Sequence, residues 1–330
     1  MIKICMIGYG HWGAILLKNF IRHKKFEVKY ICDRNQIKLT QASSVAQNNC
    51  ILINNPNQAF EDPDVDLIVI ATQASYHFDL SIAALQANKH IFVEKPFTLN
   101  SNEAEIIFQM AKKVNKKVWV DHTFLFTSAY RKLKKCIHQG MIGKPMRFHS
   151  TRTAFGLFQS DANIIWHLMV HDIYILLDLF HTVEKINSII SSASIIPDVV
   201  DSVIASIAFP NQLHATIHCD MLFAEKKREI TITGDKGILV WDETQQNKLL
   251  FYPHRASYNP LLKRVTYQSG QTEVIKIDES EALANEIDRL SEFLDNENQL
   301  TFPSQSIMLE IIKTLELIEA MDRKLCPIIT

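Results

Sequence analysis

Residues 2–13 read Ile-Lys-Ile-Cys-Met-Ile-Gly-Tyr-Gly-His-Trp-Gly, an apolar stretch that ends in the pattern G-x-G-x-x-G. Gly8, Gly10 and Gly13 are three of the nine glycines in the chain, and the next one is Gly140. In a strand-turn-helix, the first such glycine permits the tight turn, the second lets backbone approach a pyrophosphate, and the third lets the helix pack closely on the sheet. The alternative is a glycine-rich loop without a ligand. The apolar run before the glycines and the helical pattern at 14–23 favour a dinucleotide site.

Two charged residues after the next apolar run, 27–32, bear on which dinucleotide binds. Asp33 comes 20 residues after Gly13, where a carboxylate accepts hydrogen bonds from the adenosine ribose and repels a 2′-phosphate. Arg34 has the opposite preference, because a guanidinium pairs with that phosphate. We therefore predict NAD as the cofactor, with NADP as the alternative. The predicted contacts from the loop also include Tyr9, His11 and Trp12.

The first 120 or so residues alternate short apolar runs with helical patterns, as a parallel sheet covered on both faces does. The expected strands are 2–7, 27–32, 51–54, 65–71, 90–93 and 117–121. The expected helices are 14–23, 36–47, 75–87 and 101–115.

From about residue 143 the pattern changes to strands in which every second side chain is apolar, as in 214–221. This indicates an antiparallel or mixed sheet with one packed face. The other expected strands of this part are 146–153, 199–209, 228–233, 237–241 and 248–252, and helices are expected at 173–180, 281–294 and 306–322. The predicted fold is α/β. It comprises a doubly wound Rossmann domain, 1–122, and a C-terminal α/β domain with a predominantly antiparallel open sheet, 123–330.

Composition narrows the class of protein. The 35 basic and 36 acidic residues give a formal net charge of -1, which supplies no general attraction to nucleic acid or to an anionic membrane. The six cysteines are scattered without a C-x-x-C pair, which predicts free thiols in a reducing compartment. No uncharged run is long enough to span a membrane, and a strand expected from residue 2 leaves no room for a leader. A cytoplasmic location is therefore expected.

Glu94-Lys95-Pro96 directly follows the apolar run 90–93. This is the carboxyl end of a strand, the edge at which ligands bind in a doubly wound sheet. A lysine there can donate to a substrate hydroxyl, stabilise a developing alkoxide or exchange a proton. The alternative is a surface lysine beside an acid.

His167 and His171 are four residues apart, so on a helix they share one face. Histidine titrates near neutral pH and can take up the proton released when an alcohol becomes a ketone. A purely structural pair is the main alternative. We predict no metal site, because no glutamate follows His167 as in H-E-x-x-H and no cysteine cluster lies nearby.

Arg152, at the end of an expected strand and before a glycine-containing loop, could hold a carboxylate or phosphate through two hydrogen bonds. A solvated charge is the alternative interpretation.

Taken together, the motifs resemble those of the Gfo/Idh/MocA family of nicotinamide-dependent oxidoreductases over nearly the whole chain. The resemblance rests on the glycine pattern, Ala71-Thr72 with His77, Glu94-Lys95-Pro96, Asp121-His122-Thr123-Phe124, Ile142-Gly143-Lys144-Pro145 and His171-Asp172. The stretch 152–172 looks most similar to dehydrogenases that oxidise the 3-hydroxyl of a UDP-linked N-acetylated sugar or its uronic acid.

The resemblance implies a sugar or nucleotide-sugar dehydrogenase that forms a homodimer or homotetramer. It implies that Lys95 lies beside the nicotinamide and that His171 assists proton transfer. It also assigns residues to the cofactor (Thr72, Gln73, His77, Glu94) and to the substrate (Lys95, Phe124, Arg152, His167, His171). His167 stands where the family commonly has an aspartate, so the alternative function is a dinucleotide-binding regulator with weak or no catalysis.

Overall fold

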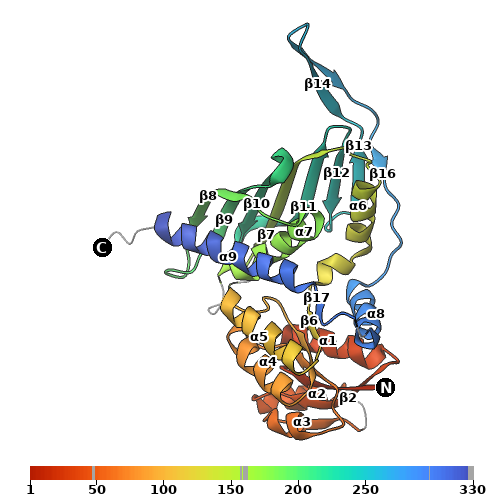
Figure 1. The fold of residues 1–330 in the computed structure, drawn as a ribbon, viewed down its shortest axis with the longest axis vertical. Coiled ribbons are helices and arrows are strands. Elements are labelled where there is room, and N and C mark those ends of the chain that lie inside the picture. The colour runs from red at the N-terminus through yellow and green to blue at the C-terminus, as the bar shows by residue number, and fades with distance from the viewer. Residues whose placement is uncertain (47–48, 157, 159–162, 297, 326–330) are drawn as a thin grey trace. The chain divides into compact units, whose positions relative to one another are not determined.

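The computed structural model of the chain describes residues 1–46, 49–156, 158, 163–296 and 298–325 (Figure 1). The chain forms two compact units, one of residues 1–123 and 281–312, the other of residues 124–280 and the chain from 313 onwards. The sequence placed a boundary after residue 122, within one residue of this division. It did not predict that 281–312 return to the first unit.

The first unit is built on a seven-stranded sheet in which every pairing is parallel. The strand order is β17-β6-β5-β4-β1-β2-β3, so the direction of winding reverses between β1 and β4. All four residues of β4 are buried, as the continuous apolar run predicts for a central parallel strand. The strands are β1 (Ile2–Ile7), β2 (Phe26–Cys32), β3 (Ile51–Ile53), β4 (Leu67–Ile70), β5 (His90–Val93), β6 (Val118–Val120) and β17 (Thr301–Phe302).

Helices connect these strands. The α1 helix packs with α8, and α4 packs with α5. The helices are α1 (His11–Arg22), α2 (Gln36–Ser43), α3 (Asn57–Glu61), α4 (His77–Gln86), α5 (Ser101–Lys113) and α8 (Ala282–Asp295). The four helices expected between residues 14 and 115 are present with shifted ends, whereas the five-residue α3 was not predicted. Asn35 caps α2 and Asn100 caps α5, each by accepting backbone N–H groups of the first turn.

Lys117 explains why the late segment joins the first unit. Its side chain is buried and donates to the carbonyl oxygens of Phe293, Leu294 and Asn296 at 2.7, 2.8 and 2.5 Å. These carbonyls lie at the end of α8, where helices leave acceptors unsatisfied and favour a positive charge. A lysine in sequence gives no sign of a partner so far along the chain.

The second unit contains an eight-stranded sheet in the order β16-β13-β12-β11-β7-β10-β9-β8. Only the β10–β7 pairing is parallel among the described strands of this sheet. Burial along β10 alternates strictly, which confirms the predicted period of two. The strands are β7 (Pro145–Phe155), β8 (Lys185–Ser192), β9 (Ser202–Ala208), β10 (His214–Asp220), β11 (Leu222–Gly234), β12 (Ile238–Asp242), β13 (Leu249–Tyr252) and β16 (Glu273–Val274).

Helix α7 (Val170–Phe180) lies across this sheet, and α6 (Ser128–His138) packs on β12 (Figure 1). Helix α9 (Gln305–Leu325) crosses the division between the units at residue 312. A separate hairpin of β14 (Arg255–Asn259) and β15 (Arg264–Gln268) extends away from the sheet.

Five of the cysteines are free thiols, as predicted, namely Cys5, Cys32, Cys50, Cys136 and Cys219. Cys326 lies outside the described residues. Of the helices described, none combines the length and the apolar character needed to cross a membrane.

Candidate functional site

The glycines of the first loop meet different surroundings. Gly8 has a φ of +97°, and a Cβ on it would lie 2.4 Å from the carbonyl oxygen of Ala71. A Cβ on Gly13 would lie 2.1 Å from the carbonyl oxygen of Gly8, so the turn and the helix could not pack as they do. A Cβ on Gly10 would meet nothing within 4 Å. The second glycine therefore borders open space, where a pyrophosphate can approach the backbone.

The start of α1 has the features of an anion site. Gly10 stands at its N-cap, and no side chain caps the helix there. The first amides of a helix lack internal partners and carry a positive partial charge, which favours a phosphate. Together with the open side of Gly10, this end of α1 fits the phosphates of a dinucleotide.

Asp33, directly after β2, holds the loop with both of its oxygens. One accepts from the backbone N–H of Tyr9 and the other from that of Asn35, each at 2.8 Å. Each carboxylate oxygen can accept a further bond, so ribose hydroxyls can still bind. Arg34 lies over the ring of Tyr76, 5.0 Å from its centroid. A guanidinium held there is available to a 2′-phosphate, so the residues present fit both NAD and NADP.

His77 acts inside the unit. The ring is buried, with Nδ1 2.9 Å from the carbonyl oxygen of Pro96 and Nε2 3.1 Å from that of Thr72. Burial is the largest influence on its pKa, which is lowered. His77 thus links the loop after β4 to the Glu94-Lys95-Pro96 segment. Gln73 in that loop is exposed.

Lys95 is half-buried at the carboxyl end of β5, and the residue before it belongs to a buried carboxyl cluster. We define the carboxyl cluster as Glu94, Asp121 and Glu286, all at most 5% exposed. Burial raises the pKa of Glu94 and of Glu286 well above the usual range, and the negative charge of Asp121 and a hydrogen bond to it add to the rise.

The carboxyls of the cluster differ in their hydrogen-bond partners. Asp121 accepts from the indole N–H of Trp12 at 3.1 Å and from the backbone N–H of Thr123 at 2.9 Å. Oε1 of Glu286 accepts from the indole N–H of Trp119 at 3.0 Å and from the backbone N–H of His122 at 3.2 Å. The other oxygen of Glu286, Oε2, and Oε1 of Glu94 are buried and have no hydrogen-bond partner among the described residues. Protons on these two carboxyls allow both to donate to Asp121. The raised pKa values of Glu94 and Glu286 favour the protonated forms of these two carboxyls.

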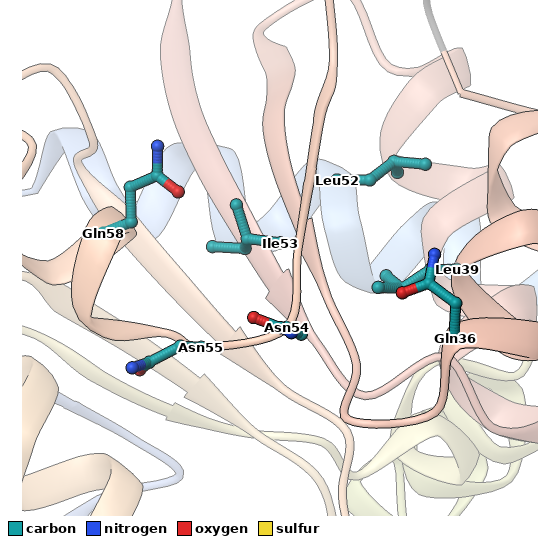
Figure 2. Close-up of a pocket in the computed structure, with 7 residues that line it drawn as sticks. All are labelled: Gln36, Leu39, Leu52, Ile53, Asn54, Asn55 and Gln58. Carbon is teal, nitrogen blue, oxygen red and sulfur yellow. The ribbon is translucent and has the colours of Figure 1, made fainter.

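A hollow of about 480 Å³ opens at the end of β3, beside α2 (Figure 2). Its lining contains four side-chain amides and no charged group, and consists of Gln36, Leu39, Leu52, Ile53, Asn54, Asn55 and Gln58. None of the predicted site residues lines it.

In the second unit, Arg152 is buried and forms an ion pair with Asp172. It is 5% exposed and donates through Nε and a terminal nitrogen to the two oxygens of Asp172, at 2.7 and 3.1 Å. The hydroxyl of Ser150 also donates to Asp172, at 2.6 Å. The expected grip of Arg152 on a substrate anion is thus replaced by an internal ion pair, which the sequence did not reveal.

His171 is half-buried in the first turn of α7 and contacts Tyr174 and Phe124. Its Nδ1 lies 3.1 Å from the hydroxyl of Tyr174, one turn along the helix. The same hydroxyl accepts the backbone N–H of Phe124 at 3.3 Å, and the Phe124 ring meets the His171 ring edge-on at 5.0 Å. The hydroxyl of Tyr174 can donate to Nδ1 or accept from it, according to the tautomer of the imidazole. Tyr174 was not predicted.

His167 belongs to a π-helical segment, Ile165–Met169, that leads into α7. The spacing argument from the sequence did not predict this π-helical turn. Over the described part of the chain, no group of three or more His, Cys, Asp or Glu side chains is arranged to hold a metal ion.

The predicted site residues thus divide between the two units. The cofactor set and Lys95 lie in the first, whereas Phe124, Arg152, His167 and His171 lie in the second. Sequence reasoning missed Asp121 as the centre of the carboxyl cluster, although it had noted Asp121 in a motif. It missed Glu286 altogether, because a glutamate in an amphipathic helix suggests solvent.

Comparison with known proteins assigns both units to one family. Residues 2–122 match the oxidoreductase family with an NAD-binding Rossmann fold, and residues 130–240 match the GFO/IDH/MocA C-terminal domain. The uncharacterized oxidoreductase YhhX of Escherichia coli K12 is 30% identical over 254 residues, 73% of this chain and 71% of YhhX.

Other relatives have assigned activities. The scyllo-inositol 2-dehydrogenase (NAD(+)) of Bacillus subtilis is 31% identical over 149 residues, 44% of this chain and 43% of that enzyme. This chain spans about half the length, or less, of several of the curated relatives it matches. In fold it is similar to UDP-N-acetylglucosamine 3-dehydrogenase GnnA of Acidithiobacillus ferrooxidans, with a TM-score of 0.80, 21% identity and 97% of each chain covered. The chain belongs to the Gfo/Idh/MocA family of NAD(P)-binding oxidoreductases.

Proposed function

We propose that this protein transfers a hydride between nicotinamide and a hydroxyl-bearing carbon of a sugar, with a nucleotide-linked sugar as the preferred substrate class. The observation that carries the proposal is the position of Lys95. Lys95 follows β5 at the carboxyl edge of the parallel sheet and is next to Glu94 of the carboxyl cluster. Trp12 of the glycine loop donates a hydrogen bond to Asp121 of the same cluster. Ligands of doubly wound sheets bind at this edge.

When bound, the nicotinamide supplies the hydride acceptor or donor, and the protein supplies position and proton transfer. The Lys95 ammonium donates a hydrogen bond to the reacting hydroxyl oxygen and stabilises the negative charge that develops on it. Lys95 directly follows Glu94, so the reacting hydroxyl would bind next to the carboxyl cluster.

His171 takes the hydroxyl proton in the oxidising direction and returns it in the reducing direction. To act as a base, its Nε2 must be unprotonated. The Tyr174 hydroxyl can accept as well as donate, so it accommodates a proton on Nδ1 in that state. His167 is proposed to orient the substrate.

The substrate class draws on two kinds of similarity. The stretch 152–172 resembles UDP-sugar 3-dehydrogenases, and one solved structure of similar fold is a UDP-N-acetylglucosamine 3-dehydrogenase. Matched relatives also include inositol dehydrogenases, which act on cyclic polyols. Both groups of substrates present ring hydroxyls to a nicotinamide enzyme.

A homo-oligomer is part of the proposal. Ile190 of β8 pairs across the sheet with Ile204 of β9, and the two side chains are 67% and 36% exposed. Residues on either side of Ile204 along β9 are buried, so this pair lies on the opposite, open face. Light scattering after size-exclusion chromatography should give twice or four times the monomer mass.

The function is tested with purified protein, NAD or NADP, and a panel of UDP-, GDP- and dTDP-sugars, free sugars and inositols. Absorbance in the NADH band should rise with at least one of them. Tight dinucleotide binding without any turnover would instead support the alternative function, a dinucleotide-binding regulator with weak or no catalysis.

A further inference from the structure

Arg228 of β11 stands directly opposite Arg152 of β7 in the antiparallel register. Side chains opposite each other share one face of a sheet. Both guanidiniums lie against the ring of Phe124, with their central carbons 4.6 Å (Arg152) and 5.6 Å (Arg228) from its centroid. Two positive charges therefore share a single aromatic side chain.

The acids near Arg228 are already bound to other groups. Asp172 holds Arg152 through both oxygens. Glu243 accepts from the indole N–H of Trp241 at 2.8 Å and pairs with Lys248 at 3.2 Å. Throughout the described ranges of the chain, no side chain forms an ion pair or hydrogen bond with the Arg228 guanidinium.

This arrangement has a free-energy cost in the absence of a ligand. Arg228 is half-buried, and burial followed by the charge of Arg152 lowers its pKa. Like charges directly across a strand pair are destabilising, and a desolvated charge without a partner is costly. An anion bound at Arg228 would remove both costs, whereas Arg152 needs none because Asp172 neutralises it.

The position relates Arg228 to the proposed chemistry. Phe124 contacts Arg228 on its face and His171 through the ring edge, at a centroid distance of 5.0 Å. We propose that Arg228 binds an oxyanion of the substrate and thereby orients the reacting hydroxyl toward His171. The inference rests on the proposed function for the identity of the substrate.

The shared chemistry of the ligand is an oxyanion that accepts two parallel hydrogen bonds from a guanidinium, which both carboxylates and phosphates do. A uronic acid would supply the first and a nucleotide diphosphate the second. Four matched substrates separate these sources: N-acetylglucosamine, its uronic acid, UDP-N-acetylglucosamine and UDP-N-acetylglucosaminuronic acid.

The test compares Arg228→Gln with wild type and with Arg147→Gln, a control on the same sheet whose exposed side chain donates to its neighbour's carbonyl. Arg228→Gln should raise KM about 10- to 100-fold for substrates with the recognised anion, while kcat changes less. Arg228→Lys should restore part of the affinity, and Arg147→Gln should leave KM unchanged. A rise only for uronic acids identifies the carboxylate, and a rise only for UDP-sugars identifies the diphosphate. An unchanged KM for every substrate would overturn the inference.

Calorimetry separates this inference from the proposed function. NAD-saturated protein is titrated with UDP and with N-acetylglucosaminuronic acid, which measures anion binding without turnover. One outcome would refute the proposed function and still support the anion site. In that outcome the wild type turns over none of the substrates, but it binds one of the anions and Arg228→Gln weakens that binding about 10-fold or more. Equal binding of both anions by wild type and Arg228→Gln would refute the anion site.

Discussion

The guanidinium of Arg152 donates to both carboxylate oxygens of Asp172, at 2.7 and 3.1 Å, in the interior of the second unit. The pair joins strand β7 to helix α7, the helix that carries His171. The pair therefore fixes α7 on the sheet.

Breaking this pair should destabilise the protein strongly. Arg152→Leu leaves the Asp172 carboxylate buried without its counter-ion, so the free energy of unfolding should fall by about 3–5 kcal/mol in urea denaturation. Lys25→Met is the control, because Lys25 pairs with Asp295 at the surface, where both side chains are more than half exposed. That change should alter stability by less than about 1 kcal/mol. Equal small losses in both variants would show that Arg152 is not structural.

Stability should depend on pH through Glu286. Its folded-state pKa is raised, so between the unfolded value near 4.5 and the folded value the native state binds the extra proton. The stabilisation is complete below the unfolded pKa and is lost as pH rises through the folded pKa. Glu286→Gln keeps an amide donor toward Asp121 and does not titrate.

Urea denaturation at a series of pH values checks this. The stability of Glu286→Gln relative to wild type should increase above pH 4.5, by up to about 1.4 kcal/mol per pH unit, until the folded pKa is reached. Glu292→Gln, at an exposed position of the same helix, should give a nearly constant difference. A pH-independent difference for Glu286→Gln would mean that Glu286 is ionised in the folded protein.

Tyr174 should act through His171. Tyr174→Phe removes the hydroxyl from Nδ1 and should lower kcat about 10-fold, with a smaller change in KM, because the imidazole loses its orientation. The pH profile of kcat should shift as well, which a purely structural role would not cause. Tyr258→Phe, in the exposed β14 strand, is the matched control. Identical pH profiles for Tyr174→Phe and wild type would remove Tyr174 from proton transfer.

Cofactor preference should respond to Asp33. Asp33→Ser removes the charge that repels a 2′-phosphate and keeps a hydroxyl for the Tyr9 amide, while Arg34 remains. The ratio of kcat/KM for NADP to that for NAD should rise about 10-fold or more. Arg34→Gln in the same background should reverse the gain. An unchanged ratio in Asp33→Ser would show that Asp33 does not face the ribose.

The sequence predicted the parts of the fold that depend on local pattern. The period of two in 214–221 and the apolar run in β4 are such patterns, and both strands form as expected. Long-range polar contacts were not predictable, because nothing near Lys117 signals the end of α8 and nothing near Arg152 signals Asp172. The π-helical turn at His167 also escaped, because the spacing argument assumed an α-helix throughout.

For the candidate site as well, local motifs could be recognised in the sequence, whereas long-range contacts could not. Motif spacing selected Lys95, His171 and Asp33 as candidates, since each stands at a strand end or a helix start. It selected Arg152 as the anion-binding arginine, because a strand-end arginine gives no indication of its partner. Only the register of β7 and β11 shows that a second arginine lies opposite the first.

The most direct test is the turnover of Lys95→Ala beside wild type, measured as NADH absorbance with whichever sugar or nucleotide sugar the wild type oxidises, together with NAD binding by calorimetry. The account predicts that turnover falls at least about 1,000-fold while NAD binds within a few-fold of wild type. Undiminished turnover by Lys95→Ala would contradict the assigned role of Lys95 and with it the proposed mechanism.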